Sequence, residues 1–160
     1  MKKSWQQKMA DKSNLPKILI LEKGFPCYNA VHRMGAEEGD QVILVNPSEV
    51  MEYMNSVPLG KLITIMGICK AIAVQHQVKG CCSLTTGIFI MTIANAVEEM
   101  KQEGVDISVP YWRTLKADGS LNPKYPGGIE AHKSNLEFEG YLINQKGKQY
   151  YVRNFEQFLV

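Results

Sequence analysis

Apolar residues recur at helical spacing through the middle of the chain. A first helix is expected from Ser48, a residue type that caps helix N-termini, to just before Pro58. A second helix is expected to start at Thr64 and to run through "KLITIMGICKAIAVQHQV". The apolar positions that define these helices are Val50, Met51, Met54, Ile65, Ile68, Ile72 and Ala73.

Two further helices are expected in the second half of the chain. After a turn at "KGCCS", the segment "LTTGIFIMTIANAVEEMKQEG" predicts a long helix that is capped by Ser83 or Thr85 and stopped by Gly104. Its middle, "IFIMTIANAV", is so apolar that it must be largely buried, which leaves only the first turn to contact a ligand. The segment "GGIEAHKSNLEFEG" predicts another helix, which ends at Gly140.

Strand patterns occur on both sides of this helical region. The run "QVILV", preceded by the turn "EEGD", predicts a strand. The tail "YLINQKGKQYYVRNFEQFLV" alternates apolar and polar residues around "QKGK" and predicts a hairpin. These elements indicate a mixed α/β (α+β) fold.

Composition adds few constraints. Of 160 residues, 45% are hydrophobic and 21% are charged, as in an ordinary globular domain. The formal net charge of +2 permits nucleic-acid binding without arguing for it. No apolar run follows the first lysines or approaches the roughly 20 residues of a membrane span. We therefore expect no membrane partner, and the cytoplasm is the expected compartment.

The cysteines give no metal or disulfide pattern. Cys81 and Cys82 are adjacent, no C-x-x-C spacing occurs, and the three histidines do not complete a recognised set of ligands. In a reducing compartment these thiols are expected to be free and mostly buried. We therefore expect no metal site and no cofactor.

The segment "VPYWRTLKADGSLNPKYPGG" has the layout of an active-site loop. With "PLGKLIT" before it and "KSNLEFEG" after it, it resembles the C-terminal DNA-binding domain of the alkylguanine-DNA alkyltransferases (methylated-DNA–protein-cysteine methyltransferases). The resemblance implies a winged-helix-like domain at 48–140, between an N-terminal lobe at 1–47 and a hairpin extension at 141–160. The positions that carry it are Gly60 to Thr64, Pro110, Arg113, Gly119, Tyr125, Gly127, Gly128, Leu136, Glu139 and Gly140.

The chain departs from this family at the reactive centre. The family's nucleophile is the Cys of P-C-H-R, and here Tyr111 stands in that position with Trp112 in place of the His. A phenol with a pKa near 10 and no adjacent base cannot replace an activated thiolate, so no catalytic residue is expected. The alkyltransferase-like proteins are similar in lacking the nucleophile, and they bind alkylated guanine without repairing it. The family's helix Tyr aligns with Ile65, and its Arg finger aligns near Thr85.

The resemblance implies a pocket that binds a base without reacting with it. Tyr111, Trp112 and Tyr125 would offer aromatic surface to a flipped base. Arg113 would steady the loop, and Glu139 would hold it through hydrogen bonds. Equally, the Tyr111 and Trp112 rings would pack the loop onto the core, and a structural ion pair is the favoured interpretation of Arg113.

The same resemblance predicts a DNA-contacting surface at the start of the third helix. The hydroxyls and backbone amides of a helix N-terminus suit phosphates and base edges. Helix capping explains the hydroxyls too, and a solvated surface explains the lysines. The residues expected to contact DNA are Thr64, Ser83, Thr85, Thr86, Lys116 and Lys124.

Three hypotheses for the function remain open at this point. The first is a non-catalytic protein that binds duplex DNA, plain or with an O6-alkylated guanine near Tyr111, and has DNA-repair proteins as partners. The second is a repurposed scaffold that acts as a regulator or as a small-molecule or protein-binding module. The third is a divergent methyltransferase that uses Cys81, Cys82 or Cys27. A steep salt dependence of DNA binding would separate the first from the second, because phosphate contacts release counterions.

Overall fold

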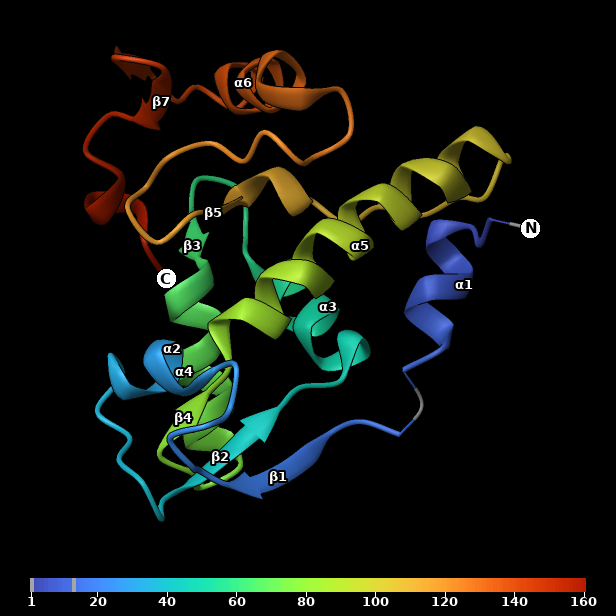
Figure 1. Cartoon of the computed structure of the whole chain (residues 1–160). Helices are drawn as coiled ribbons and strands as arrows, with labels where there is room; N and C mark the ends of the chain where they lie inside the picture. The colour runs from blue at the N-terminus through green and yellow to red at the C-terminus, as the bar shows by residue number, and fades with distance from the viewer. Residues whose placement is uncertain (1, 13) are drawn as a thin grey trace.

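The computed structural model describes residues 2–12 and 14–160, and these form a mixed α/β fold as the sequence predicts. In Figure 1 a long helix, α5, crosses the middle of the molecule, and the C-terminal segments lie together at the top. The helices are α1 (Trp5–Ala10), α2 (Tyr28–His32), α3 (Pro47–Ser56), α4 (Ile65–Gln75), α5 (Ser83–Gln102) and α6 (Gly128–Phe138), with the 3-10 helices η1 (Tyr111–Arg113) and η2 (Phe155–Phe158).

The strands are short, and most of their pairings join segments that are distant in the chain. They are β1 (Lys17–Ile20), β2 (Gln41–Leu44), β3 (Ile63–Thr64), β4 (Gly80–Cys81), β5 (Thr114–Leu115), β6 (Ile143–Lys146) and β7 (Gln149–Val152). β2, the expected strand, pairs antiparallel with β1 and parallel with β4. β3 pairs parallel with β5, and β6 and β7 form the expected hairpin.

Helix α5 is the centre of the core. Its middle is buried as expected, and it packs against α1, α3 and α4. The N-cap position of α5 is Cys82, so the expected caps Ser83 and Thr85 lie inside the helix. Among the described residues, no helix combines the length and apolar character that crossing a membrane requires.

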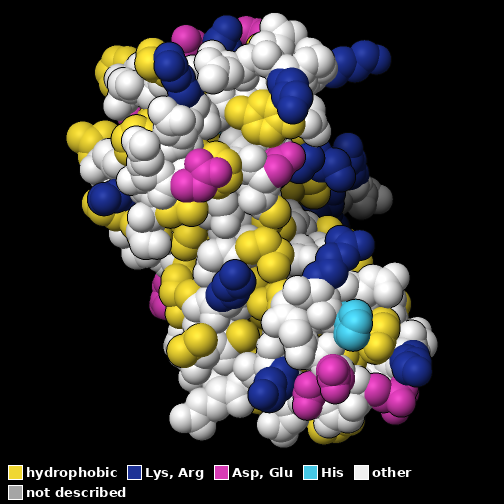
Figure 2. Space-filling view, turned by 90° about the vertical axis from the view of Figure 1, so that its left-hand side faces the viewer, with side chains coloured by type: hydrophobic (Ala, Val, Ile, Leu, Met, Phe, Trp, Pro, Cys, Tyr) yellow, Lys and Arg dark blue, Asp and Glu magenta, His cyan; other side chains and the backbone are white. Residues whose placement is uncertain are grey.

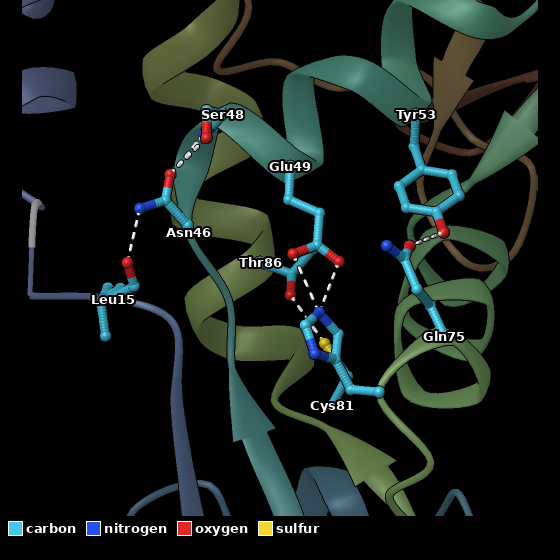
Figure 3. A network of polar contacts seen from close by, with 9 residues as sticks. Leu15, Asn46, Ser48, Glu49, Tyr53, Gln75, Cys81 and Thr86 are labelled. Atoms are coloured by element: carbon cyan, nitrogen blue, oxygen red, sulfur yellow. Dashed lines mark hydrogen bonds and ion pairs between the residues drawn. The ribbon is translucent and has the colours of Figure 1, made fainter.

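The starts of α3 and α4 are set by side-chain caps. The N-cap of α3 is Asn46, two residues before the expected cap Ser48, because the Asn46 side chain accepts a hydrogen bond from the Ser48 backbone N–H. The Asn46 amide also donates to the backbone oxygen of Leu15, which ties the first segment to this helix (Figure 3). Thr64 caps α4 by accepting a hydrogen bond from the Gly67 backbone N–H.

One hydrophobic core joins the N-terminal segment to the helical region. Ile43 and Val45 of the β2 region are fully buried in the same cluster as the inward side chains of α3, α4 and α5. β4, which lies between α4 and α5 in the chain, completes the sheet of β1 and β2. Residues on both sides of the expected boundary between 47 and 48 thus contribute to this cluster.

A second hydrophobic cluster lies under the C-terminal segments. Leu62, Leu136 and Val152 are buried in it, together with residues of the loop after β5. The chain end closes this cluster, because the Leu62 backbone N–H donates to Phe158 and the Val160 N–H donates to Leu62. This arrangement fixes α6 and the hairpin against the loop that runs from 109 to 128.

Gly119 is tightly constrained in this loop. Its φ is +83°, and a Cβ atom built on it would lie 2.3 Å from the Phe155 ring. We expect Gly119→Ala to lower the free energy of unfolding by about 2–5 kcal/mol, from left-handed backbone strain plus overpacking. Gly147→Ala is the matched control, because its φ is +62° with open space around it, and it should cost only about 1–2 kcal/mol. Urea unfolding of both variants checks this, and equal losses would contradict the clash.

Candidate functional site

The loop from 109 to 128 is held by a buried ion pair. The Arg113 Nη2 and Nε atoms donate to the Glu139 carboxylate at 2.7 and 3.0 Å, and Nη1 donates to the Val57 backbone oxygen at 2.8 Å. The two side chains are 13% and 7% exposed. The hydrogen bond to Glu139 raises the pKa of Arg113. Arg113 and Glu139 therefore bond to each other and tie the loop to the residue after α3, which is the ion pair that the structural interpretation of Arg113 described.

Tyr111 lies in the core. It is 3% exposed, and its hydroxyl donates to the Glu98 carboxylate of α5 at 2.9 Å. Burial, with the hydrogen bond to Glu98, raises the pKa of this phenol well above its usual value. The Tyr111 ring makes edge contacts with the rings of Trp112 and Tyr125, at 5.3 Å between centroids in each case. Of the two interpretations of Tyr111, a pocket wall or a packing residue, this burial fits the second, in which the ring packs the loop onto α5.

Trp112 and Tyr125 also serve mainly to pack the loop. Trp112 contacts both hydrophobic clusters. Tyr125 is 3% exposed, and its hydroxyl donates to the Thr114 backbone oxygen at 2.8 Å. One side of Tyr125 borders a small cavity of about 30 Å³ that also contacts Gly87 and Asn122. Of the three aromatic residues expected at the pocket, Tyr125 thus comes nearest to open space.

A larger groove adjoins this small cavity and lies between the start of α5 and the loop after β5. Its volume is about 660 Å³, and its walls are mostly apolar. Ile65, Ile88 and Met91 line one side, and Lys116, Asn122 and Lys124 line the other. In Figure 2, which shows the face at the left of Figure 1, hydrophobic side chains gather in a band across the middle, with Lys and Arg side chains scattered around it.

The structure separates the residues that were expected to contact DNA. Ser83, Lys116 and Lys124 line the groove. Thr85 faces a different cavity, which it shares with the N-terminal segment. Thr64 and Thr86 are corrections to the expected set: they are 7% and 0% exposed, and their hydroxyls bond to the Gly67 N–H and the Cys82 backbone oxygen. These two hydroxyls fix the starts of α4 and α5 instead.

His132 is a structural residue that the sequence did not reveal. It is 1% exposed, its Nδ1 atom accepts from the Asn122 backbone N–H at 3.0 Å, and its Nε2 atom lies 2.8 Å from the Trp112 backbone oxygen. These contacts assign the neutral tautomer with the proton on Nε2. Burial lowers the pKa of His132 to about 4. This ring ties both ends of the loop to α6, although its helical position gave no signal beyond a polar residue on the inner face.

The cysteines are all free and buried. Burial, with Cys82 nearby, raises the pKa of Cys27 to about 11. A hydrogen bond with Cys69 and burial raise the pKa of Cys81 still further. These two thiols are therefore protonated at neutral pH and are poor nucleophiles, which argues against the methyltransferase hypothesis for them. Cys27 and Cys82 instead border an apolar cavity of about 430 Å³.

A polar network at the C-terminal end of α4 connects this helix to α3. The Nε2 atom of His76, just after α4, lies 2.8 Å from the Glu49 carboxylate of α3. The Tyr53 hydroxyl donates to Gln75 at 2.5 Å, next to this pair (Figure 3). Among the described residues, no cluster of three or more His, Cys, Asp or Glu side chains could hold a metal ion.

Comparisons with known proteins define the class of fold. No protein-family model matches the chain, and no curated protein is significantly similar to it in sequence. Two solved structures share its fold: S. pombe Atl1 in complex with damaged DNA containing O6-carboxymethylguanine, at 19% identity, and S. pombe ATL in complex with DNA, at 18% identity. Each has a TM-score of 0.51, and each match covers 71% of this chain and 93% of the solved chain.

At this identity the likeness establishes the fold. The chain therefore has the fold of the alkyltransferase-like proteins, which confirms the fold that the sequence resemblance implied. The geometry adds a groove with two lysines on one wall and no cysteine among its lining residues. Such a site can bind and orient a planar, partly apolar group next to a polyanion.

Proposed function

We propose that this protein binds duplex DNA and holds an O6-alkylated guanine in the groove beside α5, without transferring the alkyl group. The observation that carries the proposal is the groove itself: it combines the start of a 20-residue helix, two lysines and apolar walls. S. pombe Atl1, which has the same fold, has been solved with damaged DNA that contains O6-carboxymethylguanine.

The start of α5 suits a phosphate backbone. Its first backbone N–H groups and the positive end of its dipole favour an anion, and the Ser83 hydroxyl adds a hydrogen-bond donor at the groove. Lys116 and Lys124 are exposed on the opposite wall and supply positive charge. Contacts of this kind position a duplex without reading its sequence.

The groove has the size and surface for one extruded base. Its 660 Å³ lies within the roughly 300–1,000 Å³ of ordinary ligand pockets. Ile65 and Met91 offer apolar surface to an alkyl group, and the Asn122 side chain offers hydrogen bonds to a base edge. A damaged base costs less to extrude than a paired one, so a lesion should enter the groove first.

Binding without reaction follows from the nucleophile position. Tyr111 is buried and bonded to Glu98, and the pKa values of Cys27 and Cys81 keep their thiols protonated. Repair of a bound lesion would then need other proteins that recognise the complex, and we propose such repair proteins as partners. The free cysteines suit a reducing compartment, and we propose the cytoplasm.

Fluorescence anisotropy with matched duplexes tests this function. One duplex carries O6-methylguanine and the other guanine, and each is titrated at two salt concentrations. We expect the lesion duplex to bind at least about fourfold more tightly, because burying one methyl group is worth about 0.8 kcal/mol. Gly87→Leu, which fills the groove from α5, should remove this preference.

Charge variants control for the mode of binding. Lys116→Gln/Lys124→Gln should make the plot of log affinity against log salt shallower by about 1.8 for both duplexes. Lys23→Gln/Lys79→Gln removes the same charge from exposed positions outside the groove and should leave the slope unchanged. Equal binding of both duplexes would contradict lesion recognition, and absence of salt-sensitive binding would overturn the DNA-binding proposal.

A further inference from the structure

A second basic cleft lies on the other side of α5, where α1 packs against it. Its volume is about 520 Å³, and Lys3, Lys8 and Lys12 contribute to its lining together with Trp5. Lys3 is paired with Asp11, and the Lys8 ammonium lies 4.1 Å from the centre of the Trp5 ring. Among the described residues, Lys8 and Lys12 form no ion pair with a carboxylate. The cleft therefore carries uncompensated positive charge.

The cleft and the groove share a wall. Ile88 and Met91 of α5 line both of them, and Ile88 is 57% exposed. Figure 1 shows α1 on one side of α5 and the segment after β5 on the other. Free lysines thus lie on both sides of one exposed ridge of α5.

This arrangement matches the geometry of a duplex groove. A helix that enters a groove of DNA has one phosphate strand on each side of it. Lys116 and Lys124 can contact only the strand on their own side. A strand on the other side of the ridge would pass the cleft, which Lys8 and Lys12 line.

The position of α1 is fixed by α5 itself. The Glu99 carboxylate accepts hydrogen bonds from the backbone N–H groups of Trp5 and Gln6, each at 3.2 Å, and from the Gln6 side chain at 3.0 Å. The start of α1 is thus attached to the second half of α5, whereas Lys8 and Lys12 line the cleft together with Ile88 and Thr92 of its first half. Glu98, Glu99 and Glu103, at the other end of α5, would repel phosphate. This division of charge would favour the lysine-lined cleft as the place for a phosphate strand.

We propose that α1 is a second DNA contact, in which Lys8 and Lys12 bind the phosphates of the strand opposite the one held by Lys116 and Lys124. The proposal rests on the proposed function, because it assigns the other half of the same DNA-binding surface. It also gives α1 a role in contacting the second phosphate strand, which the loop after β5 and α5 do not contact in the proposed arrangement.

Salt-dependent binding of a plain guanine duplex tests the contact. The full chain is compared with Lys8→Gln/Lys12→Gln, with Lys116→Gln/Lys124→Gln, and with Lys23→Gln/Lys79→Gln as the matched charge control. We expect each of the first two double variants to make the log–log salt slope shallower by about 1.8, and the four-lysine combination by about 3.6. The control variant should retain the full slope.

The outcomes distinguish the two proposals. If the wild-type chain binds and only the Lys116/Lys124 variant loses slope, the α1 contact is overturned while the proposed function stands. If the wild-type chain shows no salt-sensitive binding, both are overturned. A loss of slope in the α1 variant that the control does not share supports the contact.

Discussion

Arg113→Met should lower the free energy of unfolding by about 3–5 kcal/mol, the cost of breaking a buried ion pair from one side. The Glu139 carboxylate, 7% exposed, would lose all of its hydrogen bonds from the guanidinium, and the Val57 backbone oxygen would lose its donor. Methionine keeps most of the side-chain length, so the loss reports charge and hydrogen bonding more than volume. Urea unfolding followed by circular dichroism measures it.

Two companion variants isolate the ion pair. Arg113→Met/Glu139→Leu should be less destabilised than Arg113→Met alone, because removing both partners leaves no buried charge. Arg153→Met, at an exposed position, should change stability by less than about 0.5 kcal/mol. If Arg113→Met lowered the free energy of unfolding by no more than the Arg153→Met control does, the ion pair would not hold the loop.

Stability should fall by about 3 kcal/mol between pH 7 and pH 4 because of His132. Its pKa is about 4 in the folded chain and about 6.5 in the unfolded chain. Below pH 6.5 the unfolded chain gains a proton on this ring that the folded chain does not, so unfolding is favoured as pH falls. The contribution is fully present above pH 6.5 and is lost by pH 4. Protonation of Nδ1 would also break the hydrogen bond that this atom accepts from the Asn122 backbone N–H, because two donors would then face each other.

A second histidine, His32, provides the matched control. His132→Gln should be less stable than wild type at pH 7 but should show a flatter decline toward pH 4. His32→Gln, at an exposed position, should keep the wild-type decline. Urea unfolding at half-unit pH steps gives both curves, and a decline unchanged by His132→Gln would refute the assignment.

Helices α3 to α6 could be predicted from the sequence because their signals are local. The apolar spacing of α4 and α5, Gly140 after α6 and the glycine turn of the hairpin each act within a few residues. The start of α3 was displaced because Asn46 and Pro47 cap it more effectively than Ser48. The two-residue strands β3, β4 and β5 carry no periodic pattern, and their pairing depends on tertiary contacts.

The site was predictable only in part. The roles of Arg113 and Glu139 followed from the resemblance, and the lysines at 116 and 124 from their place in the loop. The buried position of Tyr111 could not be foreseen, because its hydroxyl bonds to Glu98 of α5, a tertiary contact for which the sequence gave no signal. Thr86 was placed on the surface because a helix start attracts ligands, whereas its hydroxyl in fact bonds to the preceding turn.

The two tryptophans of the chain lie in different environments, so their intrinsic fluorescence reports on different parts of the structure. Trp112 packs between the two hydrophobic clusters, so its emission follows the cooperative loss of the core. Trp5 borders the α1 cleft beneath an ammonium group, so its emission follows local events there and not the core. Tryptophan fluorescence of the Trp5→Phe variant can therefore monitor unfolding. That of the Trp112→Phe variant can monitor occupancy of the cleft, and neither measurement needs an attached dye.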